Sequence, residues 1–121
     1  MKYLLPILIC VFNASCSNNY EEDYITVDDN DTIINVSYIE DVVPILDANC
    51  VNCHNPNNSR GDVVLSSYGS TINTVVPGSG DISELYRVIA HIANPMPPSY
   101  KLSNNEIETI KVWIDEGASN N

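Results

Sequence analysis

Cysteine, histidine and methionine are the residue types in this chain whose spacing suggests chemistry. The 121 residues include four Cys, two His and two Met. Cys50 and Cys53 lie three positions apart, and His54 follows directly. Two side chains at this spacing on a helical turn face the same way, and the next residue lies beside them. The pattern fits four kinds of site: a zinc site, a thioredoxin-like redox pair, a local disulfide, or two thioether bonds to a haem whose iron the histidine binds.

The rest of the sequence favours the haem interpretation. A thioredoxin-like pair would require a βαβ pattern, which is missing here. A zinc site would require more ligands than the few remaining Cys and His residues readily supply. A disulfide between residues three apart is possible but unusual. We therefore predict one covalent haem c per chain, attached through Cys50 and Cys53, with His54 as an iron ligand.

Met96 is the predicted second axial ligand. It is the only methionine after Met1, and it lies in Asn94-Pro95-Met96-Pro97-Pro98. Flanking prolines restrict the backbone, so such a loop can hold a thioether in place with little ordering cost. A methionine that fills a gap in the core is the alternative. His91 lies one residue off the apolar stripe of its predicted helix, and we expect a surface residue there rather than a ligand.

Capping patterns predict where helices begin. In each pattern a Ser or Asp is followed three residues later by Glu, so that both side chains can bind free backbone N–H groups. The three patterns are Ser37–Glu40, Asp81–Glu84 and Ser103–Glu106. Together with the apolar spacing that follows, they predict helices over 42–51, 82–93 and 104–116.

Apolar stripes give each helix a buried face. The second stripe consists of Leu85, Tyr86, Ile89 and Ile92, and the third of Ile107, Ile110, Trp113 and Ile114. Pro44 suits the first turn of the first helix, and Gly117 suits the end of the third. Residues 55–80 are rich in Gly, Ser, Asn and Pro and are predicted to be mostly loop, with Val63-Val64-Leu65 as a short extended apolar piece.

The amino terminus has the pattern of an export signal. Lys2 precedes a short apolar run, which is typical of a secretory signal peptide and too short to span a membrane. Ala14-Ser15-Cys16 follows, and this resembles the lipobox of bacterial lipoproteins. We expect a signal peptide over 1–15 and lipidation of Cys16, with ordinary secretion as the alternative. Both place the mature protein outside the cytoplasm.

Charge separates a leader from the domain. Residues 17–37 hold six acidic residues and no Lys or Arg, which predicts a solvated, disordered tether over 16–37 ahead of a domain over 38–119. The net charge of −11 argues against nucleic-acid binding. The cations after the signal peptide are Arg60, Arg87, Lys101 and Lys111, and any of them could pair with haem propionates. We favour Arg87, because its helix leads to Met96.

Several blocks of residues resemble a known family in the same order. They are Val43-Pro44-Ile45-Leu46 and Cys50-Val51-Asn52-Cys53-His54, then Leu65-Ser66-Ser67-Tyr68, Val76-Pro77-Gly78, Ser83-Glu84-Leu85-Tyr86-Arg87, Met96-Pro97-Pro98 and Trp113-Ile114-Asp115-Glu116-Gly117-Ala118. Residues 38–118 resemble a small class I cytochrome c domain of the planctomycete type. Where that family often has a glycine before its Met-Pro-Pro, this chain has His91.

The resemblance implies an all-α fold of three to four helices wrapped around a covalent haem, with a long loop between the attachment helix and the second helix. It implies His54 and Met96 ligation and electron transfer rather than enzymatic activity. We therefore expect a monomeric, lipid-anchored electron carrier for extracytoplasmic redox proteins with basic or neutral docking faces. The alternatives are a five-coordinate haem sensor or peroxidase-like enzyme, and an electron-entry subunit of a separate enzyme.

Overall fold

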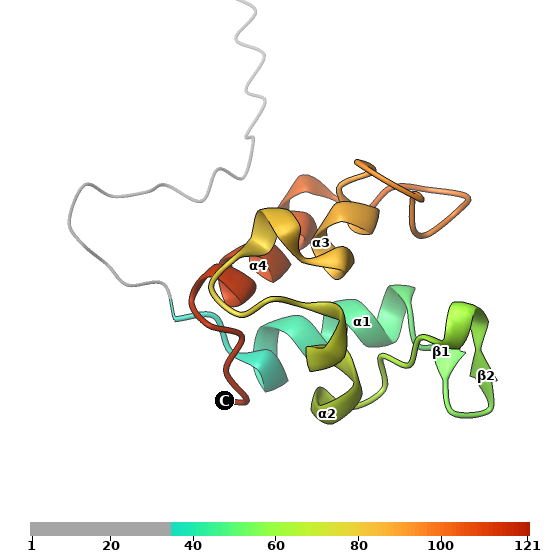
Figure 1. Cartoon of the computed structure of the whole chain (residues 1–121), viewed down its shortest axis with the longest axis horizontal. Coiled ribbons are helices and arrows are strands. Elements are labelled where there is room, and N and C mark those ends of the chain that lie inside the picture. Colours follow the sequence, from blue (N-terminus) through green and yellow to red (C-terminus); the bar gives the residue numbers. More distant parts are fainter. Residues whose placement is uncertain (1–34) are drawn as a thin grey trace, which may run out of the picture. The chain divides into compact units, whose positions relative to one another are not determined.

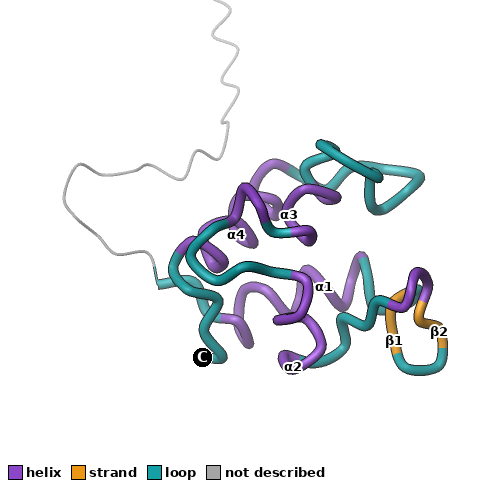
Figure 2. The backbone as a smooth tube through the Cα atoms, in the orientation of Figure 1, coloured by secondary structure: helices purple, strands orange, loops and turns teal. Residues whose placement is uncertain are grey.

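The computed structural model describes residues 35–121. The predicted signal peptide, the predicted lipidation site Cys16 and most of the predicted tether lie outside the described residues. About half of the described part is helical, as expected for an all-α domain, and its strands form one small two-stranded sheet (Figures 1 and 2). Within residues 35–121, no helix combines the length and apolarity needed to cross a membrane.

The first helix is continuous from a capped start. A π-helical turn, Tyr38–Val42, runs directly into α1, Val43–Asn49, which lies inside the predicted range. The Ser37 hydroxyl accepts a backbone N–H three residues ahead, as the capping pattern predicts. Pro44 lies in the first turn of α1, directly after the π-helical turn, as the sequence predicts.

The segment after α1 contains more structure than the predicted loop. Strands β1, His54–Asn55, and β2, Asn58–Ser59, form an antiparallel hairpin, and a 3₁₀ turn, Arg60–Asp62, follows. Helix α2, Tyr68–Thr71, continues into a second 3₁₀ turn, Ile72–Thr74. The four residues of α2 are too few to show helical periodicity in the sequence.

Helix α3, Glu84–Ile89, begins later than predicted. A 3₁₀ turn, Gly80–Ile82, includes the predicted N-cap Asp81 and the first predicted helical residue, so the N-cap is Ser83. The Ser83 hydroxyl does not cap the helix. It accepts the backbone N–H of Val76 at 2.8 Å and thereby ties the preceding loop to α3.

Helix α3 also ends earlier than predicted, because the backbone reverses at His91. His91 has a φ of 60°, and the backbone N–H of Ile92 donates to the Arg87 carbonyl at 2.9 Å. With the bond from the His91 N–H to the Val88 carbonyl, this forms a Schellman motif. The prediction that Ile92 lies on the buried stripe is therefore wrong, and its side chain is 61% exposed.

Helix α4, Asn104–Asp115, agrees with its prediction. Ser103 and Glu106 form both bonds of a capping box. Gly117 follows the helix with a φ of 107°, in a second Schellman motif. The predicted face is buried, and its members are Ile107, Ile110, Trp113 and Ile114.

Three aromatic rings join the first helix, α2 and α4. The Tyr38 ring lies 5.1 Å from that of Tyr68 and 5.2 Å from that of Trp113. The Trp113 indole N–H donates to the Ser119 carbonyl, and the Tyr68 hydroxyl donates to the Ala118 carbonyl, both at 2.9 Å. The polar atoms of the two side chains are thus paired while their rings pack.

The packed part of the chain extends beyond 38–119 at both ends. Val36 is buried, and its N–H donates to the Glu116 carboxylate. Asn121 accepts the N–H of Tyr38 on its side chain and that of Ile39 on its carbonyl. The last residue therefore satisfies two free N–H groups at the start of the first helix. In Figure 1 this end of the domain lies opposite the β1–β2 hairpin.

Candidate functional site

The motif residues form a compact turn at the end of α1. The N–H groups of Cys53 and His54 both donate to the Cys50 carbonyl, at 3.1 and 3.0 Å. This helix-like turn places the two thiols and the imidazole on the same cavity. Asn55 fastens the turn from outside, because its side-chain amide donates to the Val51 carbonyl at 2.7 Å.

His54 is held through its backbone and through its ring. Its carbonyl accepts the Leu65 N–H at 2.8 Å, and its Nδ1 lies 3.3 Å from the Val63 carbonyl. A carbonyl can only accept, so Nδ1 is the donor, and in the neutral ring Nε2 keeps the lone pair for a metal. Histidines that bind metals usually donate their other N–H in this way. The segment 63–65, predicted only as a short extended apolar piece, therefore also orients His54.

The thiol of Cys50 is the more protected of the two. Burial, followed by the nearby Glu106 carboxylate, raises the pKa of Cys50 to about 11. Cys53 is half-buried. Both thiols are free, so both are available to form covalent bonds to a cofactor.

Met96 reaches the site on the loop that follows α3. Its backbone N–H donates to the Val88 carbonyl at 3.0 Å, which fixes the loop to the end of the helix. Its side chain is 37% exposed and lines the same cavity as the two thiols and His54. The structure thus brings together all four residues predicted for this site, while His91 does not line the cavity.

The cavity has a volume of about 770 Å³, which is in the range of cofactor and ligand pockets. Apolar side chains from the extended piece, α3 and the Met96 loop form much of its wall, and they include Leu65, Leu85, Val88, Ile89 and Pro97. Two thiols, an imidazole with a free nitrogen and a thioether, set among apolar walls, match the donor set and surroundings of a covalently attached haem. The zinc alternative needed further ligands, and within residues 35–121 no three His, Cys, Asp or Glu side chains gather as a metal site would require.

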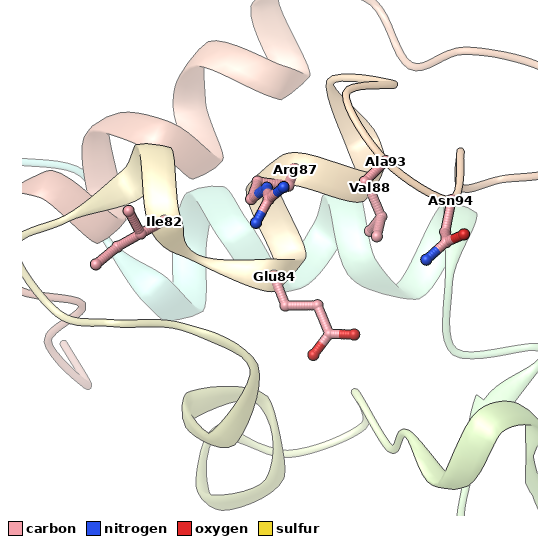
Figure 3. A pocket seen from close by; sticks show the side chains of 6 residues that line it. All are labelled: Ile82, Glu84, Arg87, Val88, Ala93 and Asn94. Atoms are coloured by element: carbon pink, nitrogen blue, oxygen red, sulfur yellow. The ribbon is translucent and has the colours of Figure 1, made fainter.

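A smaller cavity of about 410 Å³ adjoins the first along α3. Glu84, Val88 and Asn94 line both cavities, and Figure 3 shows them projecting from α3 and the turn after it. Arg87 lines only the smaller cavity, whereas Arg60 lines the larger one. Of these two candidates for pairing with haem propionates, only Arg60 lines the cavity that holds the thiols and His54.

Comparison with known proteins agrees with this geometry. Residues 50–99 match the family model of Planctomycete cytochrome C, a stretch that runs from Cys50 past Met96. The match supports a cytochrome c-like domain in this chain. This family implies haem c and haem-based electron transfer. No curated protein and no solved structure gives a significant match.

Two further residues line the larger cavity that no motif in the sequence pointed to. Asn49 and Tyr100 line the larger cavity and contact each other, with the Tyr100 hydroxyl donating to Asn49 Oδ1 at 2.9 Å. Asn49 directly precedes the motif, and Tyr100 lies four residues after Met96. Neither residue belongs to the motif or to a predicted apolar stripe, so only their contact across the cavity identifies them.

Proposed function

We propose that this chain is a monohaem c-type cytochrome that carries single electrons. Cys50 and Cys53 would hold the haem through thioether bonds, and His54 and Met96 would bind its iron. The observation that carries this proposal is the convergence of these four side chains on one largely apolar cavity. The match over residues 50–99 supports it independently.

The residues of the chain would bind and orient the group and exclude water. The Val63 carbonyl keeps His54 in the tautomer whose Nε2 lone pair is free to bind a metal. Met96 would contribute a thioether, which favours the reduced iron relative to a second histidine. A bound haem supplies the one-electron Fe(III)/Fe(II) couple. With both ligands in place no iron position is open, which suits electron transfer rather than catalysis on a small molecule.

The proposed setting is the outer side of a bacterial membrane. Cys16 would carry the lipid, and the acidic segment 16–37 would tether a monomeric domain. The chain is acidic, with 16 Asp and Glu against 5 Lys and Arg. Redox partners with basic or neutral docking faces would therefore associate with it, most strongly at low salt.

Replacement of Met96 tests the ligation. The oxidised wild-type holoprotein should show the weak long-wavelength absorption band of sulfur–iron ligation, and Met96→Ala should abolish it because Met96 is the only methionine after Met1. His91→Ala is the matched control and should retain the band. A wild-type protein that lacks the band and binds CO or peroxide rapidly would contradict the carrier proposal and favour the sensor or peroxidase-like alternative.

A further inference from the structure

The loop that carries Met96 has few anchors along the cavity. Met96 is bonded to the end of α3, and Leu102, at 4% exposed, packs into the core just before α4. Between these points, the only hydrogen bond that residues 97–102 make with any part of residues 35–121 runs from the Tyr100 hydroxyl to Asn49. This bond is therefore the polar contact that ties the loop to α1 across the cavity.

Asn49 is a rigid partner for this bond. Its Nδ2 donates to the Ile45 carbonyl at 2.9 Å and to Glu106 Oε1 at 3.3 Å, which leaves Oδ1 directed at Tyr100. The Glu106 carboxylate is itself fixed, because it accepts the hydroxyl and the N–H of Ser103 in the capping box of α4. These bonds, with a smaller contribution from Asn49, lower the pKa of Glu106. Asn49 thus offers Tyr100 an acceptor whose direction is already set by α1 and α4.

The Asn49–Tyr100 bond joins two opposite parts of the proposed haem site. Asn49 belongs to the helix that leads into the attachment motif, and Tyr100 belongs to the loop of the sixth ligand. Both line the cavity together with Met96. We propose that Asn49 and Tyr100 are positioning residues that hold the Met96 loop closed, and so set how well the Met96 sulfur competes with an external ligand. This inference rests on the proposed ligation by His54 and Met96.

The expected effect is modest because Tyr100 is 49% exposed. A bond of this kind shifts an open–closed equilibrium by roughly 2- to 10-fold. An external ligand that binds only the open loop gains apparent affinity by the same factor. Imidazole is a suitable probe, because it replaces a thioether on oxidised iron and the exchange can be followed by absorbance.

Imidazole titration of the oxidised holoprotein tests the inference. Tyr100→Phe, which removes the hydroxyl and keeps the ring, should tighten imidazole binding roughly 2- to 10-fold. Asn49→Ala should act in the same direction, and the double variant should bind no more tightly than the stronger single variant, since both remove one bond. Two effects that multiply in the double variant would overturn the assignment of one shared contact.

Tyr68→Phe is the matched control. It removes a hydroxyl whose bond to the Ala118 carbonyl has the same length of 2.9 Å, and Tyr68 does not line the cavity. It should lower thermal stability and leave imidazole affinity unchanged. Equal tightening in Tyr68→Phe, or wild-type affinity in Tyr100→Phe, would overturn the inference while the long-wavelength band of the wild type still supported Met96 ligation. Loss of that band in the wild type itself would overturn the proposed ligation, and this inference with it.

Discussion

At the scale of single residues, Cys50 and Cys53 lie in different environments. Cys50 is buried beneath the end of α1 and lies near the Glu106 carboxylate, whereas Cys53 is half-buried. Burial and a nearby negative charge both disfavour the thiolate, which is the reactive form of cysteine. The two thiols of the haem-free chain should therefore differ in reactivity even though they are three residues apart.

Alkylation of the haem-free protein measures this difference. Because the pKa of Cys50 is raised to about 11, its thiol stays protonated at pH 8, and iodoacetamide should modify Cys53 first. Peptide mass spectrometry over time would give both rates, and we expect them to differ by at least about 10-fold. Glu106→Gln should speed the reaction at Cys50, because it removes the charge but leaves the burial. Equal rates in the wild type would contradict the structure of this turn.

At the scale of elements, the end of α3 determines where the Met96 loop begins. The Schellman motif at His91 reverses the chain, so that the loop leaves the helix beside the cavity instead of extending the helix toward Ile92. A positive φ disfavours every residue with a Cβ, and glycine is the usual residue at this position. The chain therefore accepts a cost at His91 that glycine would remove.

His91→Gly should stabilise the protein. Glycine adopts the left-handed conformation without the steric cost that His91 bears, but it also has more freedom in the unfolded chain. The first effect is larger, and the free energy of unfolding should rise by about 0.5–1 kcal/mol. Urea unfolding would measure it. The haem absorption spectrum should not change, because His91 does not line the cavity. Ala90→Gly, at a neighbouring residue with a φ of −76°, is the control and should destabilise. A changed spectrum in His91→Gly would show that His91 acts at the haem.

A second contact between elements depends on pH. The Asp115 carboxylate on α4 accepts bonds from the Lys111 ammonium and from the Gly80 N–H, both at 2.6 Å, which joins α4 to the turn before α3. The bond from Lys111, with that from Gly80, holds the pKa of Asp115 below its ordinary value of 3.8. The stabilisation is therefore complete above pH 3.8 and is lost as the pH falls through the lowered value.

Asp115→Asn should lower the free energy of unfolding at pH 7 and have less effect in acid. Since Asp115 is 40% exposed, solvent screening limits the expected loss to about 0.5–1 kcal/mol. Urea unfolding at pH 7 and at pH 3 would show the difference between variant and wild type shrinking at the lower pH. Asp81→Asn, which removes the longer 3.7 Å contact of an 81% exposed side chain with Lys111, should change little at either pH. A constant difference for Asp115→Asn would mean that the charge is not responsible.

At the scale of the whole molecule, different contacts stabilise the two ends of the domain. Around Tyr38, Tyr68 and Trp113 the helices pack on one another and on the C-terminal segment. At the other end, the cavity separates three segments that line it. These segments are α3, the turn 50–54 and the Met96 loop. None of the three aromatic residues lines the cavity. The first end is held by protein contacts alone, and the second would be completed by the bound group.

Removal of the haem should therefore lower the melting temperature strongly. Each 100 Å² of apolar cavity wall returned to water costs about 2.5 kcal/mol. For a domain of this size each kcal/mol lowers the Tm by roughly 4–8 °C, so we expect a fall of more than about 10 °C. Circular dichroism would compare the holoprotein with the haem-free chain. Below its own Tm, the haem-free chain should keep the near-ultraviolet signal of Trp113. Equal melting temperatures would contradict a structural role for the haem.

The sequence by itself determined the local features of this protein. The spacing of Cys50, Cys53 and His54, the prolines around Met96 and the capping box of α4 each act within a few residues, so the sequence shows them directly. The family match over 50–99 bears out the cytochrome c-like resemblance that these features carry. The tertiary structure decided the contacts between distant segments. It placed Val63 against His54, Tyr100 against Asn49 and Arg60 rather than Arg87 at the larger cavity. Hydrogen bonds across 9 and 51 residues depend on how the chain returns on itself, and no local pattern encodes that.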